Sequence, residues 1–340
     1  MSYKRFDTED VVVSAESVTA PVWSNDTVTL TTFFTSSTQI GGTSADYYYD
    51  VYQTASTLDT ARVQFSIAYA DKQGSGSLYY NDNVAGKSPS STVYGQYRNL
   101  ALGDEEADFT FGSITSEHFY VIAIDRARYK EKLLPGTVSL KLHVSSSGAE
   151  INLTDNSQVV STTTFNDAGR VYELVSGSTG TVYTGLQTNG YTANSGSYGK
   201  LLPDIGVLLL NGNALDAPAV SGGLALSTNR GANTAGANLS KFYDLLTLSG
   251  SFRIQSEETI SSNFVFVRAR NSEFNYSTNP SLITGSGELR HNVMIDSPQS
   301  YITAVGLYND NNDLLAVAKL SRPLLKDFTK ESLVRIKLDY

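Results

Sequence analysis

The first segment whose residue types and spacing suggest chemistry is Ala85-Gly86-Lys87-Ser88. It resembles the end of a phosphate-binding loop, but such a loop needs a glycine five residues before Gly86, where Asn81 stands. Pro89 also opposes the start of a helix that would supply amide donors to a phosphate. We therefore interpret this segment as a surface loop and not as a nucleotide site.

Histidine and carboxylate side chains are the next candidates for catalysis or metal binding. The three histidines are His118, His143 and His291. No two have a metal-binding spacing, and we interpret His143 as part of a strand. The acidic runs 104–106 and 257–258 are interpreted as solvated charges, which are commoner than acid–base pairs on a single segment. We therefore expect no catalytic residue, no metal site, no cofactor and no enzymatic activity.

Alternation with a period of two dominates the elements that must position any functional residue. Apolar residues alternate with polar ones in 62–69 and in 137–144, which is typical of strands with one buried face. The segments 119–124 and 205–210 are continuous apolar runs, and we interpret them as strands. The second run is much shorter than the roughly 20 residues that cross a bilayer, so we expect no membrane insertion.

A β-hairpin is predicted near the end of the chain. Two strand-like segments, 302–308 and 314–320, flank Asn309-Asp310-Asn311-Asn312-Asp313. Asn and Asp tolerate the left-handed conformations of a tight reversal. We interpret these oxygen-rich residues as a turn, because Leu314 and Leu315 stand where a calcium loop needs a ligand and a glycine. The segment 333–338 predicts a closing strand.

The middle of the chain departs from the strand pattern. Leu239, Phe242, Tyr243 and Leu246 fall at helical spacing, which predicts a short helix. The stretch 221–238 is small and polar, and it predicts an exposed loop or a flexible arm.

Length and composition indicate the fold class. The chain has 340 residues, of which 17% are charged, and it has no cysteine. Its polar residues suit strands and turns, so we predict a mainly β fold with two or three β-sandwich-like domains and one or two short helices. The predicted domains are 1–148, 149–250 and 251–340. The net charge of −9 argues against a protein that coats nucleic acid.

Tyrosine is abundant, with 21 residues, and several of these lie between Asp46 and Tyr52. Tyrosine combines a large contact area with one polar tip and is favoured at interfaces. Neighbouring strand residues point to opposite faces, so these side chains cannot all enter one core. Ordinary strand propensity is the alternative explanation. The candidate contact residues are Tyr47, Tyr48, Tyr49 and Tyr52.

Several longer phrases together resemble one protein family. They lie at Tyr3–Ser14, Tyr94–Leu100, Arg128–Thr137, Arg268–Pro280, Val305–Asp310 and Ala316–Leu320. These phrases are similar to the large virion structural proteins of T4-like tailed bacteriophages, especially those of marine cyanobacteria. They are spread over most of the chain, and 150–240 carries the weakest resemblance.

The resemblance implies a subunit of the contractile tail, in the wedge region of the baseplate, made in the host cytoplasm and present in several copies in a symmetric virion. Its expected partners are other virion proteins. The expected contact regions are 46–52, 268–280 and both termini, including Arg268, Arg270, Phe274, Tyr276 and Tyr340. Two alternatives stay open. One is a fibre component that binds carbohydrate through exposed tyrosines, Trp23 and Asn/Asp loops, and the other is a neck or capsid-decoration protein.

Overall fold

The structure, a computed structural model, describes residues 3–35, 48–74, 90–183, 196–230, 235–277 and 279–339. Strands account for 44% and helices for 14% of the residues. The mainly β fold predicted from the sequence is therefore confirmed.

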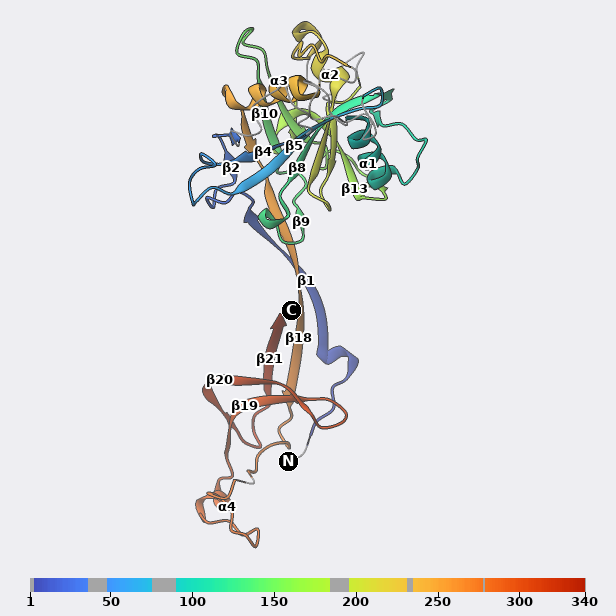
Figure 1. Cartoon of the computed structure of the whole chain (residues 1–340). Helices are drawn as coiled ribbons and strands as arrows, with labels where there is room; N and C mark the ends of the chain where they lie inside the picture. Colours follow the sequence, from blue (N-terminus) through green and yellow to red (C-terminus); the bar gives the residue numbers. More distant parts are fainter. Residues whose placement is uncertain are drawn as a thin grey trace. The chain divides into compact units, whose positions relative to one another are not determined.

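The chain forms two compact units (Figure 1). Unit 1 combines Met1–Ser17 with Thr259–Tyr340, and unit 2 is Val18–Glu258. The chain passes from one unit to the other within strands β1 (Val11–Pro21) and β18 (Gln255–Ala269).

Unit 2 is built on one large curled antiparallel sheet. Among the described residues, its strands follow the order β2-β17-β10-β11-β13-β15-β16-β8-β5-β4-β3, and β12 and β14 also pair with β13. The bounds are β2 Thr29–Leu30, β3 Phe34–Thr35, β4 Tyr48–Tyr52, β5 Val63–Asp71, β8 His118–Ile124, β10 Ser139–His143, β11 Glu150–Asp155, β12 Thr164–Asn166, β13 Gly169–Ser178, β14 Thr181–Val182, β15 Gly199–Leu202, β16 Val207–Asn211 and β17 Ser251–Arg253. Outside this sheet, β6 (Thr110–Phe111) pairs with β7 (Ile114–Thr115), and β9 (Lys132–Leu133) pairs with β18.

The central strands of this sheet are buried on both faces. In β8, Phe119 and Val121 belong to one hydrophobic cluster, and Tyr120 and Ile122 belong to another. Strand β16 divides its side chains in the same way. Successive side chains of a strand point to opposite faces, so a strand packed on both faces must be apolar throughout. This explains the continuous apolar runs at 119–124 and 205–210.

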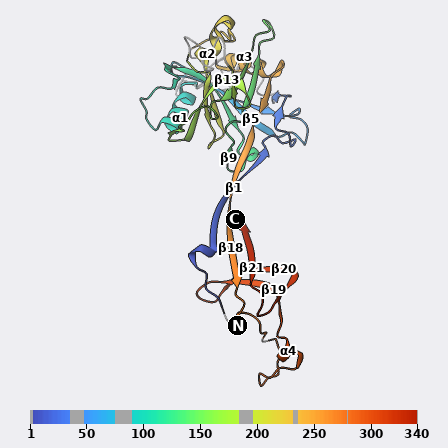
Figure 2. The same ribbon diagram turned by 180° about the vertical axis from the view of Figure 1, so that it is seen from behind.

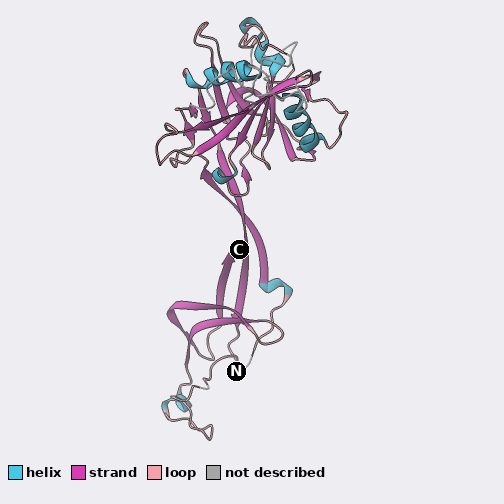
Figure 3. Ribbon diagram, in the orientation of Figure 1, coloured by secondary structure: helices cyan, strands magenta, loops and turns pink. Residues whose placement is uncertain are grey.

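Helices cover the two faces of the sheet (Figures 1, 2 and 3). Helix α1 (Ser90–Leu102) places Val93 and Tyr94 in the cluster that contains Phe119. Helices α2 (Gly212–Asp216) and α3 (Ala235–Thr247) lie against the other face. Phe242 of α3 stacks on Tyr120 with ring centroids 4.9 Å apart. Unit 2 therefore has a helix, sheet, helix arrangement of layers.

The sheet curls so strongly that its two ends approach each other. The terminal strands β2 and β3 are joined by residues 31–33, and so short a linker spans at most about 14 Å. Trp23 fills the enclosed space, with its ring centroid 6.0 Å from that of Phe65 on β5 and 5.1 Å from that of Phe252 on β17. The Trp23 indole N–H donates to the Phe252 carbonyl oxygen at 3.0 Å. These aromatic contacts join the two ends of the sheet.

Unit 1 is smaller and has a much smaller core. Strand β18 pairs with β21 (Ser332–Asp339) from Ser262 to Ala269, and β19 (Ser300–Tyr308) forms a hairpin with β20 (Leu314–Lys326). A short helix, α4, spans Val293–Asp296. The core cluster consists of Val265, Leu307 and Ile336, with partly buried neighbours around them.

Several predicted elements are present. The hairpin around 309–313, the closing strand, the strands at 119–124 and 137–144, and the helix at 239–246 correspond to β19–β20, β21, β8, β10 and α3. The hairpin turn is closed by the Asn309 backbone N–H, which donates to the Asp313 carbonyl oxygen at 3.1 Å.

Other features differ from the sequence interpretation. Position 148 lies in the turn between β10 and β11, which pair with each other, and position 250 directly precedes β17 of the same sheet. The two units therefore do not follow the predicted ranges 1–148, 149–250 and 251–340. Leu224 and Leu226, within the stretch expected to be an exposed loop or arm, are buried. They supply core to the face of the sheet that α3 covers.

Candidate functional site: polar cluster and interaction surface

A buried polar cluster in unit 2 is the first candidate site. The Arg230 guanidinium lies 2.9 Å from both the Asp71 and the Glu117 carboxylates. Asp71 ends β5 and its side chain is fully buried, and it also accepts hydrogen bonds from the Tyr69 hydroxyl at 3.1 Å and the Gln73 backbone N–H at 3.0 Å. A buried carboxylate needs such donors to replace its hydration. The ion pair between Arg230 and Asp71 attaches Arg230 to the end of β5.

A second polar group lies on the neighbouring strand. His118 Nε2 is 3.4 Å from Asp216 Oδ2, and Asp216 Oδ1 accepts from the backbone and the hydroxyl of Thr228 at 2.8 and 2.7 Å. The Tyr120 hydroxyl is 2.9 Å from the Thr228 hydroxyl. Gly212 leaves room for the imidazole, because a Cβ there would lie 2.1 Å from His118 Cδ2.

Burial and hydrogen bonding oppose each other in setting the pKa of these carboxyls. Burial alone would raise the pKa of Asp71, but hydrogen bonds from Arg230, Gln73 and Tyr69 outweigh it and hold that pKa below its usual value. The same balance, with His118 and Thr228 as donors, lowers the pKa of Asp216. Burial, reinforced by Asp71, raises the pKa of Tyr69 far above its usual value.

The polar cluster has the contacts of a structural anchor. A histidine–carboxylate pair activates a nucleophile only when a hydroxyl or thiol lies beside the ring. The Ser116 hydroxyl instead donates to the His118 carbonyl oxygen at 2.8 Å, and the His118 side chain is buried. Within the described residues, no three His, Cys, Asp or Glu side chains are grouped as metal ligands. The cluster holds 226–230 against β5 and β8.

Strand geometry places some of the predicted contact tyrosines on the surface and others in the core. Tyr48 is 40% exposed, whereas Tyr49 is buried and its hydroxyl is 3.1 Å from the Ser240 hydroxyl of α3. Tyr52 is half-buried. Tyr47 lies outside the described residues, as do Tyr340 and the phosphate-loop-like segment 85–88. Tyr49 is therefore a core residue, and Tyr48 remains a surface candidate.

The remaining predicted contact residues all belong to unit 1. Arg268, Arg270, Phe274 and Tyr276 are exposed. Phe274 has a φ of 58°, which is an unusual backbone conformation for a bulky residue. The Ser300 hydroxyl donates to the Phe274 carbonyl oxygen, so this turn is tied to the start of β19.

The buried side chain of Lys326 also holds the turn that contains Phe274. The Lys326 ammonium donates to the Asn275 side-chain oxygen at 2.7 Å, to the Asn271 carbonyl oxygen at 3.0 Å and to the Asp327 carbonyl oxygen at 2.9 Å. An ammonium has three donors, and all three are satisfied although the side chain is fully buried. Phe274 and Tyr276, on either side of Asn275, are thereby held in place.

In the described part of the chain, exposed apolar side chains are concentrated in unit 1. Among the residues that the structure describes, most of the exposed large hydrophobic side chains belong to this smaller unit. On the hairpin they are Tyr301, Tyr308, Leu314, Leu315, Val317 and Leu324, and elsewhere in the unit they include Val293, Ile295, Phe328 and Leu333. The sequence shows the alternation of these strands but not whether a second layer covers them. We name the exposed side chains on the hairpin the hairpin apolar surface.

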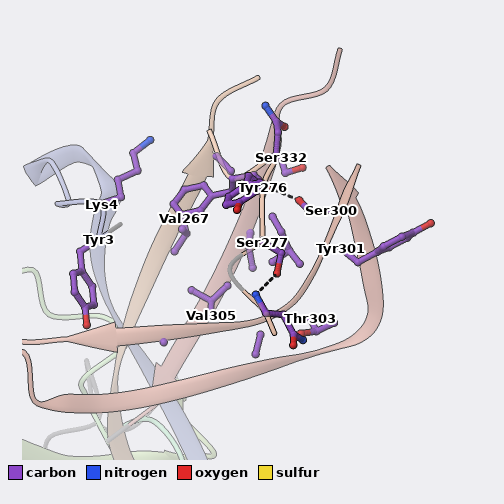
Figure 4. A pocket seen from close by; sticks show the side chains of 18 of the residues that line it. Tyr3, Lys4, Val267, Tyr276, Ser277, Ser300, Tyr301, Thr303, Val305 and Ser332 are labelled. Atoms are coloured by element: carbon purple, nitrogen blue, oxygen red, sulfur yellow. Dashed lines mark hydrogen bonds between the residues drawn. The ribbon is translucent and has the colours of Figure 1, made fainter. Parts of the chain in front are cut away.

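A groove of about 1630 Å³ lies within unit 1 (Figure 4). Tyr3 and Lys4 border it on one side, and Val267, Tyr276, Thr303 and Val305 are among the labelled residues that line it. Its lining is rich in aromatic and small polar side chains. We call this the β19 groove.

Comparison with known proteins gave no relatives: no family model, curated protein or solved structure matched this chain. In the described residues, no helix is long and apolar enough to cross a membrane. Trp23, which the sequence suggested as a sugar-binding platform, is only 1% exposed and belongs to the core of unit 2. It is therefore excluded as a surface contact for carbohydrate.

Proposed function

We propose that this chain is a structural subunit of a phage virion, in the wedge region of a contractile-tail baseplate, and that it acts through protein–protein contacts of unit 1. The observation that carries the proposal is the hairpin apolar surface, where Tyr301, Leu315 and Val317 are 62%, 68% and 60% exposed. Leu315 and Val317 are two residues apart on β20 and so share one face of the hairpin. Large exposed apolar areas are uncommon on proteins that function alone and mark interaction sites.

Two further observations support an assembly role. The phrases at 268–280, 305–310 and 316–320, which carry part of the resemblance to phage virion proteins, all fall in unit 1. Strand β1 is exposed along almost its whole length and is the last strand of its sheet. Long exposed edge strands readily pair with other chains. Partners would be other virion proteins, with several copies of this chain in a symmetric particle.

The test is to locate the chain in purified particles produced from the genome that encodes it. Mass spectrometry of the particle is expected to detect the chain, and cryo-electron microscopy is expected to place it in the baseplate with unit 1 in contact with neighbouring subunits. Absence from the particle contradicts the virion role, and density on a fibre tip, the neck or the capsid contradicts the baseplate position.

A pair of substitutions tests whether the hairpin apolar surface makes the contact. Leu315→Lys places a charge on this surface, whereas the control Val220→Lys places one on unit 2 at a side chain that is 82% exposed. Burying an unpaired charge in an interface costs several kcal/mol, so incorporation of L315K is expected to fall about tenfold or more. V220K is expected to be incorporated like the unaltered protein. Equal incorporation of both variants contradicts a contact at Leu315.

A further inference from the structure

The β19 groove is bordered by the edge of a strand. Seven consecutive residues of β19, from Ser300 to Gly306, line it. Side chains alternate between the two faces of a strand, so a cavity beside one face is lined by every second residue. A cavity lined by consecutive residues lies along the strand's edge. The β19 backbone therefore borders the groove directly.

That edge has no strand partner in the described chain. Within the ranges that the structure describes, strand β19 pairs only with β20, in a two-stranded sheet. In an antiparallel pair, about every second residue of a strand directs its N–H and C=O groups away from the partner. These groups of β19 are therefore available to another strand.

The floor of the groove is a sheet face, in contrast to its β19 side. Val267 and Ala269 of β18 line it, and they are directly opposite Val334 and Ser332 of β21, which also line it. These residues are two apart on each strand, as one face of a sheet requires. A segment lying along β19 would therefore bury its side chains against a floor of small, mostly apolar side chains.

Few of the residues that line the groove are charged. Of the lining residues, only Lys4, Arg5 and Asp310 are charged. The Lys4 ammonium already donates to the Arg268 carbonyl oxygen at 2.6 Å and to the Glu273 carboxylate at 3.2 Å. The stretch from Ser300 to Gly306 offers no counter-charge, and burying a charge there would be costly. An occupant of this stretch must be uncharged.

We propose that the β19 groove receives an extended, uncharged, largely apolar segment of a neighbouring protein, which pairs with the free edge of β19 as an added strand. A cavity of about 1630 Å³ exceeds the roughly 300–1,000 Å³ typical of small-molecule pockets, which favours a polypeptide segment. Strand addition obtains its affinity from main-chain hydrogen bonds and its specificity from alternate side chains. This inference rests on the assembly role proposed above.

The first test compares hydrogen exchange of the full chain in solution and in the particle. Amides at alternate positions of 300–308 are expected to exchange about tenfold more slowly, or more, in the particle, because strand pairing adds hydrogen bonds there. Equal exchange in a particle that contains the chain overturns the proposed site and leaves the virion role standing. Absence of the chain from the particle would contradict the proposed virion role itself.

Variants and density then test the chemistry of the occupant. Ala304→Lys introduces a charge in the uncharged stretch, and the control Leu333→Lys places one on β21 at a residue that does not line the groove and is 59% exposed. Incorporation is expected to fall about tenfold or more for A304K alone. Equal incorporation of the two variants overturns the proposal. The proposal is also overturned if density in the groove belongs to a charged segment, to a glycan, or to a second copy of this chain that contacts the groove through a folded surface instead of an extended segment.

Discussion

At the scale of single residues, Asp71 shows most clearly how hydrogen bonds in unit 2 offset the cost of burying a charge. Its carboxylate is fully buried and accepts hydrogen bonds from Arg230, Tyr69 and Gln73. The donors outweigh the cost of burial, so the folded protein keeps this pKa below its usual value. Folding therefore favours the ionised form, and stability must depend on pH through this residue.

Asp71→Asn is expected to destabilise unit 2 by about 2 kcal/mol at pH 7, because charged hydrogen bonds are lost from a buried site. The folded-state pKa lies below the unfolded value of about 3.9. The stabilisation is therefore present above that value and is lost as pH falls through the folded pKa. The difference between D71N and the unaltered protein should shrink from pH 7 toward pH 3. Urea unfolding followed by fluorescence of Trp23, the single tryptophan, measures it.

The matched control is Asp108→Asn, the same substitution at an exposed ion pair. Asp108 lies 2.5 Å from the Lys72 ammonium, and both side chains are more than a third exposed. Exposed pairs contribute about 0–1 kcal/mol. A loss in D108N as large as that in D71N would contradict the importance of burial at Asp71.

At the scale of elements, α3 stabilises the curled sheet from one face. Phe242 is fully buried, stacks on Tyr120 of β8 and belongs to the same cluster as Leu140 of β10. These two strands are separated by four others along the sheet. One helix therefore packs against distant parts of the sheet and fixes its curvature.

Phe242→Ala is expected to cost about 3–5 kcal/mol, the usual range for truncating a buried phenylalanine. Leu248→Ala, just beyond the end of the same helix at a side chain that is 46% exposed, is expected to change stability by less than about 0.5 kcal/mol. Urea unfolding followed by Trp23 fluorescence measures both. A loss below about 1 kcal/mol for F242A would contradict a central role for α3.

Local sequence signals predicted the elements better than their arrangement. The Asn/Asp turn at 309–313 and the helical spacing from Leu239 to Leu246 act over a few residues, and the hairpin and α3 are present. The curled sheet could not be predicted, because it pairs β8 with β16, which are separated by more than 80 residues. Helix α1 was not predicted, because its sequence is only weakly amphipathic and is helical mainly through packing on β5 and β8. The helix begins at Ser90, directly after Pro89. The expectation that Pro89 opposes a helix start is therefore wrong, because proline is favoured at the start of a helix.

The candidate surface was predicted only in part. The resemblance predicts Arg268, Phe274 and Tyr276 as contact residues, and their side chains are exposed. Residue type alone predicts Tyr49 as a contact residue, but it is buried because of strand alternation and the position of α3. The β19 groove was not predicted, because its floor joins β18 to β21 across more than 60 residues. Residue type alone does not determine which apolar strand is left uncovered.

At the scale of the whole molecule, the two units differ in how much core they have. Among the described residues of unit 1, the buried hydrophobic ones are Val265, Ala269, Leu307 and Ile336, whereas unit 2 supplies two large clusters on the two faces of its sheet. Hydrophobic burial is the main favourable term in folding. Unit 1 taken alone is therefore expected to be the less stable unit, and contacts with a partner would supply the missing burial.

Native-state hydrogen exchange in low concentrations of urea tests this difference. Amides of β18 and β21 between 262 and 269 and between 332 and 339 are expected to open with a free energy about 3 kcal/mol or more below that of β8 and β16, a difference equal to burying one or two further large side chains. In the proposed particle, the difference in opening free energy between the two units is expected to narrow. A partner that binds the native form of unit 1 stabilises that form. Equal opening free energies in the isolated chain would mean that unit 1 is stable without partners, and the exposed apolar side chains of its hairpin would then need another explanation.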